Sequence, residues 1–372
     1  MRIISVFTFI TIMCMSEHCV AQEVAPHDMF VLGSYITDHQ FRIDTLDAYG
    51  AIWIFANPID GDTIYKVIPY FAHYAAMGML KCGTPVYTKA VKNWMQWYLS
   101  HIDSLGRMTN HYYSLGGASD SISDPNDNDA QDADPAMFWT LASEYYTATK
   151  DNAFFTKQVK AKLENQAKFI SENLLDADNL TFANVNYAMK YTMDNSEVYE
   201  GFTALATIEK EAYHDIGGYN MYKAKAARTQ TAIMLRLYDP VSGLYMNSTN
   251  TKTNVKNWYE AGVVATIWPQ LCGVETYKAE RSSHQREVLC QNFNDKNGKD
   301  WTSDRFVKDS VSVDTYPFAV TGYVFSMAGD TEKGQKQVAY VVQMFKDPAE
   351  SSHLNIEEAG WSLMQLAAIF KK

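Results

Sequence analysis

The connections between helical segments alternate between short and long along this chain, and this alternation restricts the folds that it can adopt. Apolar residues at helical spacing, such as Phe138, Leu141 and Tyr145, predict twelve helices. We place them at roughly 28–40, 63–82, 85–102, 132–149, 153–175, 194–213, 218–237, 258–272, 278–294, 314–329, 331–346 and 355–371. From residue 63 onward, short turns and long loops alternate between successive helices. The long loops cover roughly 103–131, 176–193, 238–257, 295–313 and 347–354.

The alternation of loop lengths predicts how the helices are arranged. Short turns make antiparallel helical hairpins, and long loops join one hairpin to the next. Six hairpins can close into a double ring, with the N-termini of the inner helices and the long loops on one face. The sequence therefore predicts an all-α fold, a single (α/α)6 barrel over residues 22–372. An α-solenoid is the alternative, but it would show a fixed repeat length, which we do not find.

The first 21 residues have the pattern of a signal peptide. Arg2 precedes an apolar run that ends at Met13, and small residues lead to Ala21. The run is too short to span a bilayer, and no later segment is apolar enough to do so. We therefore expect a secreted or periplasmic protein that begins at or near Gln22. N-terminal sequencing of exported protein tests this, and a sequence starting at Met1 would reject it.

The charge of the chain narrows the class of partner. Asp and Glu number 43 against 32 Lys and Arg, which gives a net charge of -11. Removal of the leader takes away one acid and one base, so the net charge stays the same. We therefore expect no nucleic acid and no membrane surface as partner, and a strongly anionic polysaccharide is disfavoured.

The cysteines and the oxygen-rich segments give little sign of a metal. No Cys-x-x-Cys motif or histidine cluster is present, so we expect no metal and no other cofactor. Residues 124–129 could hold Ca²⁺, but they lack the EF-hand spacing and read better as an Asx-rich turn. Cys272 and Cys290 could form one disulfide, which would leave Cys82 as a buried thiol.

Acidic residues stand at the start of all six predicted inner helices. They are Asp62, Asp132, Asp194, Glu260, Asp314 and Glu357. Aspartate at a helix start is ordinary, because its carboxylate accepts hydrogen bonds from free amides. Capping alone does not require the aromatic and amide neighbours seen at 194–199 and 257–260. A carboxylate-lined, aromatic-walled cavity does fit glycoside hydrolysis, where one acid protonates the leaving oxygen and a second carboxylate activates water or attacks.

Four segments, at 69–80, 129–146, 191–201 and 258–271, resemble blocks of the bacterial six-hairpin glycosidase-like proteins. The resemblance spans most of residues 22–372 and implies an (α/α)6 toroid that acts on carbohydrates. In the unsaturated-uronyl hydrolases of this superfamily, a catalytic aspartate opens an inner helix much as Asp194 does. A second aspartate comes from the preceding inner helix, where this chain has Asp132 and Asp134. The doubled aspartate of that branch is absent, because Asn195 follows Asp194.

From these observations we expect a glycoside hydrolase that acts on an oligo- or polysaccharide as a monomer. Asp194 is the expected general acid, with Asp132 or Glu260 as the second carboxylate. The expected substrate contacts are Asn57, Asp134, Asn195, Tyr199, Trp258, Tyr259 and Trp361.

Two other function classes stay open from the sequence. A polysaccharide lyase of the same shape could use His111 with Tyr112 or Tyr113 to abstract a proton, although a solvent-facing loop histidine is the simpler reading of His111. His73 lies on an apolar helical face and reads as a core histidine. A toroid that binds glycans without cleaving them is the third class. The sugar, the linkage and the stereochemical outcome do not follow from the sequence.

Overall fold

The computed structural model describes residues 24–55, 64–114, 127–128, 130–253, 260–292, 318–352 and 354–370. The proposed leader, Asn57, Trp258 and Tyr259 lie outside these residues, as does most of the segment at 124–129. The helices are α1 (Asp28–Asp38), α2 (Pro69–Cys82), α3 (Pro85–His101), α4 (Ala133–Thr149), α5 (Lys157–Phe169), α6 (Thr192–Glu211), α7 (Ile216–Arg236), α8 (Ala265–Leu271), α9 (Glu280–Asn292), α10 (Ala319–Ala328), α11 (Thr331–Lys346), α12 (Pro348–Ser351) and α13 (Ile356–Phe370). Two π-helical turns, η2 (Ile170–Leu174) and η3 (Glu260–Val264), adjoin α5 and α8.

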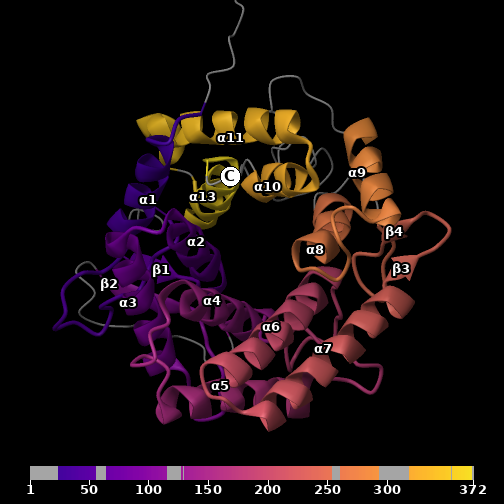
Figure 1. The fold of residues 1–372 in the computed structure, drawn as a ribbon, viewed down its shortest axis with the longest axis horizontal. Coiled ribbons are helices and arrows are strands. Elements are labelled where there is room, and N and C mark those ends of the chain that lie inside the picture. Colours follow the sequence, from indigo (N-terminus) through magenta and orange to yellow (C-terminus); the bar gives the residue numbers. More distant parts are fainter. Residues whose placement is uncertain are drawn as a thin grey trace, which may run out of the picture.

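The helices form the predicted double ring. The inner helices α2, α4, α6, α8, α10 and α13 contact one another in this order, and α13 contacts α2 to close the circle. Figure 1 shows α1, α3, α5, α7, α9 and α11 around this inner ring. Closure by the last helix against the first inner helix confirms the toroid and rules out an open solenoid.

Glycines permit the closest contact in the inner ring. A Cβ atom on Gly78 of α2 would lie 2.4 Å from the carbonyl oxygen of Gly360, and one on Gly360 of α13 would lie 2.5 Å from that of Tyr74. A similar contact joins α4 to α6, where a Cβ on Gly201 would lie 2.6 Å from the Cα of Ala136. Backbone atoms cannot move away as a flexible side chain can, so these positions require glycine.

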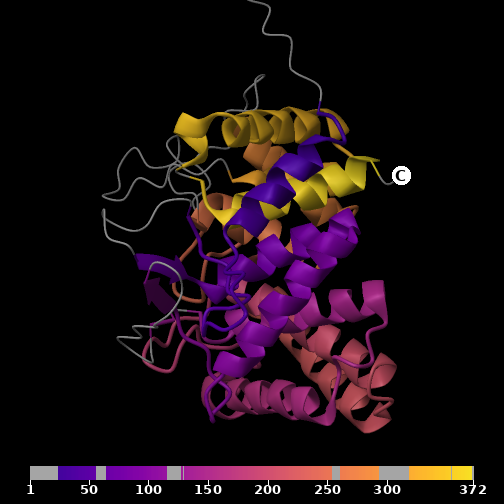
Figure 2. The ribbon, with the colours of Figure 1, turned by 90° about the vertical axis from the view of Figure 1, so that its left-hand side faces the viewer.

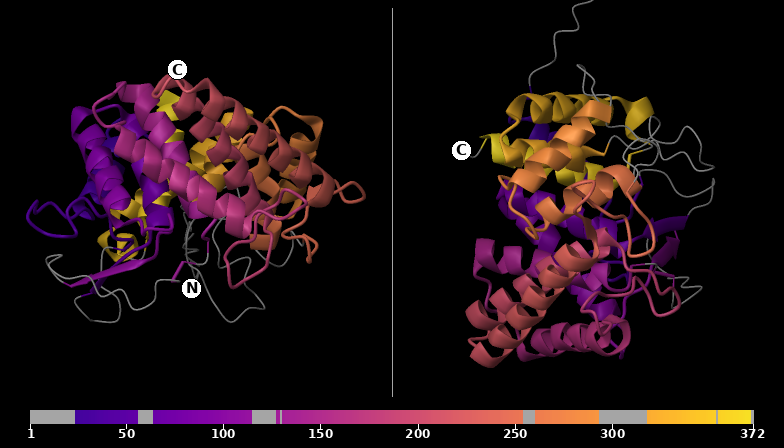
Figure 3. Two further views of the ribbon diagram at one scale, coloured as in Figure 1. Left: turned by 90° about the horizontal axis from the view of Figure 1, so that it is seen from below. Right: turned by 90° about the vertical axis from the view of Figure 1, so that its right-hand side faces the viewer.

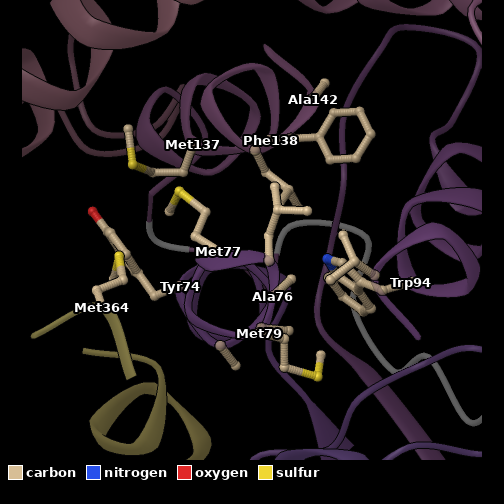
Figure 4. Close-up of a cluster of buried hydrophobic side chains, with 14 of the residues drawn as sticks. Tyr74, Ala76, Met77, Met79, Trp94, Met137, Phe138, Ala142 and Met364 are labelled. Carbon is tan, nitrogen blue, oxygen red and sulfur yellow. The ribbon is translucent and has the colours of Figure 1, made fainter. Parts of the chain in front are cut away.

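The core lies between the helices of the ring. Figure 4 shows Met77 of α2, Trp94 of α3 and Phe138 of α4 in one group with Met364 of α13. Trp94 and Phe138 are fully buried. Burial of such large apolar side chains against neighbouring helices is the main stabilising contribution in a fold of this kind.

The described parts of the connections before α4, α6 and α13 lie on one face, at the N-terminal ends of these inner helices (Figures 2 and 3). Strands β1 (Ile64–Val67) and β2 (His111–Ser114) pair there, and β3 (Tyr238–Asp239) pairs with β4 (Leu244–Tyr245). Successive connections are hydrogen-bonded: Gln131 N–H donates to Ala183 O at 2.8 Å, and Thr192 N–H to Asn247 O at 2.9 Å. Ile356 N–H donates to Ile54 O at 3.1 Å and joins the last connection to the first. This face is therefore the mouth of the ring.

Most predicted helices are present, with local differences. The helix expected from residue 63 begins at Pro69, because residues 64–67 form β1 instead. The helix expected at 153–175 begins at Lys157 and ends in η2. Gly83, at a φ of 69°, ends α2 in the left-handed conformation that glycine favours.

Two further observations concern the expected disulfide and the membrane. Cys272 and Cys290 are both free, so the possible disulfide does not form, and Cys82 is half-buried rather than buried. Among the described helices, none has the length and apolar character needed to cross a membrane.

Candidate active site

Glu197 lies inside the inner ring and is held by side chains of two other inner helices. Its Oε1 accepts hydrogen bonds from the hydroxyls of Tyr70 and Tyr74, both at 2.5 Å, and from Trp268 Nε1 at 2.8 Å. The residue is completely buried, and its Oε2 has no partner among the residues that the structure describes. Three donors on one oxygen fix the carboxylate and direct the other oxygen elsewhere. This pattern is what an orienting cage for a reactive carboxylate requires.

Glu357 approaches Glu197 from α13. It is half-buried, and its Oε1 accepts a hydrogen bond from Trp361 Nε1 at 3.0 Å. The Trp361 ring is 4.4 Å from that of Tyr74 and 5.8 Å from that of Tyr323, measured between centroids. Tyr74, Tyr323 and Trp361 come from three different inner helices, so they bring α2, α10 and α13 together beside the two carboxyl groups.

Burial shifts the acid–base properties of both glutamates. It raises the pKa of Glu197 to about 7, even though the hydrogen bonds from Tyr70, Tyr74 and Trp268 lower it. Burial, with the charges of Glu358 and Glu197, raises the pKa of Glu357 to about 8 against the lowering effect of Trp361. Carboxyl groups that titrate near neutral pH are candidates for acid–base catalysis, and burial raises the pKa of Glu358 to about 7 in the same way.

Asp132 has the predicted place but a structural set of partners. It is fully buried and caps α4, where it accepts a hydrogen bond from Ala133 N–H at 2.9 Å. Its other oxygen accepts from the Thr181 hydroxyl at 2.5 Å. Burial raises its pKa to about 7, and the charge of Glu197 contributes to this shift. Asp132 therefore lies close enough to Glu197 to influence it, with both oxygens occupied.

Asp134 and Asn195 were expected to contact the sugar, but both are completely buried and bonded within the protein. The Asp134 carboxylate lies 3.1 Å from His73 Nε2 and accepts from the Tyr98 hydroxyl at 3.1 Å. Asn195 accepts from Thr181 N–H at 2.7 Å and donates to Tyr191 O at 2.9 Å. These contacts fix the chain around the mouth, so the expectation of direct sugar contact is corrected to a structural role.

The other residues that the sequence predicted for the site lie in several different surroundings. Asp194 lies in the first turn of α6 and is 5% exposed. Tyr199 is half-buried and packs on the small cluster that includes Ile233 and Tyr245. Trp361 is only 3% exposed, so it supports Glu357 rather than offering a free stacking surface. Glu260 begins η3, but its side chain, like Asn57, Trp258 and Tyr259, lies outside the described part.

The two histidines considered from the sequence are both interior residues. His73 is fully buried, as expected, and its Nδ1 accepts from Trp94 Nε1 at 3.2 Å, which leaves Nε2 to donate to Asp134. His111 is 1% exposed and lies in β2, 5.0 Å from the Trp97 ring, so the reading as a solvent-facing loop residue is wrong.

One group of carboxylates could hold a metal among the residues described. It consists of Glu164, Glu209 and Asp215, on the outer side of the ring. The Lys160 ammonium already lies 2.9 Å from Glu209 and 2.7 Å from Asp215. A lysine therefore supplies the positive charge that these acids need.

Sequence reasoning included Glu357 among the acids at helix starts and covered Glu197 only within the segment at 194–199, and it selected neither as catalytic. Two spacings could have drawn attention to them. Tyr70 and Tyr74 are four residues apart, as are Glu357 and Trp361, so each pair lies on one face of its helix. Glu197 follows Asp194 by three residues and lies one turn deeper on α6. None of these spacings indicates that α2, α6, α8 and α13 meet around Glu197.

Comparisons with known proteins agree with this architecture. No protein-family model matches the chain, and no curated protein sequence matches it. Among solved structures, a glycosidase variant aligns with a TM-score of 0.67 at 12% identity, over 93% of this chain and 99% of that chain. Another variant of a glycosidase, solved in complex with glucose, aligns with a TM-score of 0.66 at 12% identity and the same coverage. The GH76A alpha-1,6-mannanase from Salegentibacter sp. HEL1_6 aligns with a TM-score of 0.56 at 9% identity, over 92% of this chain and 98% of that chain. The chain thus has the six-hairpin glycosidase-like fold, an (α/α)6 toroid.

Proposed function

We propose that this protein is a glycoside hydrolase in which Glu197 and Glu357 form the catalytic pair of carboxyl groups. The observation that carries the proposal is the cage around Glu197, in which donors from α2 and α8 hold one oxygen of a buried carboxylate beside a second acid from α13. This pair replaces Asp194 with Asp132 or Glu260 as the favoured assignment. The glycosidase neighbours, one of them with glucose bound, support a carbohydrate substrate. Export to the periplasm or beyond the cell remains part of the proposal.

The surroundings of the two acids assign them different roles. Glu357 has the higher pKa and a single donor, so it retains its proton near neutrality and serves as the general acid. Glu197 has three donors that stabilise its anion, so it serves as the base that activates water or as the nucleophile. Tyr70 and Tyr74 keep their protons as donors, since burial raises the pKa of both hydroxyls well above the usual value.

Hydrolysis and elimination leave different products, and we expect hydrolysis. A panel of neutral oligosaccharides and aryl glycosides, with polyuronides alongside, should yield new reducing ends from a neutral sugar. Elimination would instead create a conjugated double bond that absorbs in the near ultraviolet. An absorbance rise on a polyuronide that depends on His111 would favour the lyase. Tight binding of a glycan without any cleavage would favour the binding protein.

The sequence also argues against the substrate of one structural neighbour, the alpha-1,6-mannanase. Inactive variants of the Salegentibacter mannanase replace two aspartates that are adjacent in its sequence. No two aspartates are adjacent anywhere in this chain. We therefore do not extend alpha-1,6-mannan cleavage to it, and the panel should include that polymer as a comparison.

We expect a narrow, bell-shaped dependence of kcat/KM on pH with its maximum between about 7 and 8. Below a pH of about 7, Glu197 gains a proton and cannot act as the base. Above a pH of about 8, Glu357 loses the proton that the leaving oxygen needs. The two limbs belong to the coupled pair rather than to single residues. A maximum near pH 4, typical of unshifted carboxyl groups, would contradict this assignment.

A further inference from the structure

The start of α10 is held by a side chain from another helix. Its first residue is Ala319, and Phe318 before it supplies no side-chain cap. The Ala319 N–H donates instead to Glu358 Oε2 of α13 at 2.7 Å, and the Phe318 N–H donates to the same carboxylate. Glu358 is 4% exposed and Ala319 is fully buried, so bulk water does not compete for these contacts. The free amides in the first turn of α10 therefore depend on Glu358.

The backbone at Phe318 is shaped to bind an anion. Its φ of 49° and ψ of 59° lie in the left-handed region, which is uncommon for a residue with a large side chain. A left-handed residue beside a right-handed helical one turns successive N–H groups toward one point, and such concavities bind anions. Burial raises the pKa of Glu358 to about 7, and the two amide hydrogen bonds act against burial because they favour the anion. The backbone of one helix start and the carboxylate of another helix thus match each other.

Glu358 is itself fixed in place at the mouth of the ring. Its own N–H donates to Asn355 Oδ1 at 3.0 Å, and Asn355 is 2% exposed. Asn355 also forms a β-bridge with Phe55 in the connection before α2. Glu358 therefore ties together three segments where the ring closes: this connection, the first turn of α13 and the start of α10.

This tie lies next to one of the two proposed catalytic residues. Glu357 directly precedes Glu358, and its carboxylate accepts the hydrogen bond from Trp361 one turn further along α13. The Trp361 ring packs in turn on Tyr323 of α10, at 5.8 Å between centroids. Because a helix moves as a unit, a shift at the start of α10 would also move Tyr323. The tryptophan that orients Glu357 would then lose its support.

We propose that Glu358 is a positioning residue, which holds α10 against α13 at the mouth and thereby fixes Trp361 and the general acid Glu357. This inference rests on the proposed function. The Glu358 carboxylate is buried against the α10 backbone, so it acts through Glu357 and not on the substrate.

The test compares two substitutions of Glu358 in the whole chain, on the glycoside that the substrate panel identifies. Glu358→Ala removes the acceptor and should lower kcat by roughly 10- to 100-fold, because a misplacement of about 1 Å can have an effect of this size. KM should change less than kcat, since the acid is displaced but no sugar contact is removed. Glu358→Gln keeps an oxygen for the Ala319 N–H and should recover most of the lost kcat.

Asp330→Ala is the matched control. Asp330 caps the outer helix α11, where it accepts a hydrogen bond from Lys333 N–H at 3.4 Å. Loss of this cap should lower Tm by a few degrees, as loss of the Glu358 cap should, but should keep kcat within about twofold. An unchanged kcat in Glu358→Ala, an equal loss of kcat in Asp330→Ala, or a glutamine variant as impaired as the alanine variant would overturn the inference.

A third substitution keeps the test valid if Glu358→Ala fails to fold. Glu358→Asp retains the charge but withdraws the carboxylate by one methylene group from the Ala319 N–H. It should lower kcat, by less than the alanine variant does, and Glu358→Gln should exceed it. A wild-type kcat in Glu358→Asp would contradict the positioning role, because the charge alone would then be sufficient.

Hydrogen exchange separates this inference from the proposed function, because it needs no substrate. In Glu358→Ala, the amides at the start of α10 and in the first turn of α13 should exchange faster than in the wild type. In Asp330→Ala, only those at the start of α11 should do so. These exchange changes without hydrolysis of any glycoside would count against the function alone. Hydrolysis with unchanged exchange and unchanged kcat in Glu358→Ala would count against the role of Glu358.

Discussion

Replacing Glu197 with glutamine should lower kcat on the hydrolysed glycoside by roughly 10²–10⁴-fold, the usual scale for loss of a general acid or base. The fold should survive, because the glutamine oxygen can accept the same hydrogen bonds from Tyr70, Tyr74 and Trp268. Only the ionisable character of the side chain is lost. Steady-state kinetics with circular dichroism as a check on folding would measure both.

Two matched variants make this result specific. Glu209→Gln changes a buried glutamate of the same helix that lies outside the ring, and should keep kcat within about twofold. Asp194→Asn keeps the size of the side chain in the first turn of α6 and removes only its ability to ionise. Near-normal turnover in Glu197→Gln, with a large loss in Asp194→Asn, would return the general-acid role to Asp194 as the sequence suggested.

Gly360→Ala should destabilise the protein by about 1–3 kcal/mol or more, the cost of overpacking a well-packed interface. The added methyl group would lie 2.5 Å from Tyr74 O and 2.7 Å from the Cα of Ala75, both backbone atoms of α2. The two helices would have to separate at the point where the ring closes. Thermal denaturation would show the effect as a fall in Tm of several degrees.

Gly217→Ala is the control for Gly360→Ala. It also adds a methyl group to a helix, but the nearest atom is the Asp215 side-chain oxygen at 3.2 Å. Alanine favours helix over glycine, so this variant should be neutral or slightly stabilising. Equal losses of stability in the two variants would mean that the contact between α2 and α13 has no special role.

The architecture could be predicted because its signals are local. Gly83 and Gly329 end helices in the left-handed conformation, and Asp132 and Asp330 begin others with side-chain caps. Loop lengths then indicated which helices pair. The start of α2 was harder to predict, because the pairing of residues 64–67 with His111–Ser114 joins segments that are distant in sequence.

The site could be predicted only in part. The acids at the mouth were recognised, but the choice among them depends on which side chains meet across the ring. Glu197 is singled out by Tyr70, Tyr74 and Trp268, and no local pattern links these residues. Asp134 illustrates the opposite error: its position at a helix start suggested substrate contact, whereas His73 and Tyr98 occupy its carboxylate.

The contact between α13 and α2 also determines the order in which this chain can fold. During synthesis α2 leaves the ribosome long before its partner at residues 356–370. Each hairpin can form from local contacts as it appears, but the closing contact joins segments that are far apart in the sequence and carries the entropic cost of closing that long loop. Until then, the surface of α2 around Gly78 stays open to water and to other chains. A nascent chain stalled before α13 is therefore not a smaller toroid but an open arc with part of its core exposed, a natural target for chaperones and proteases.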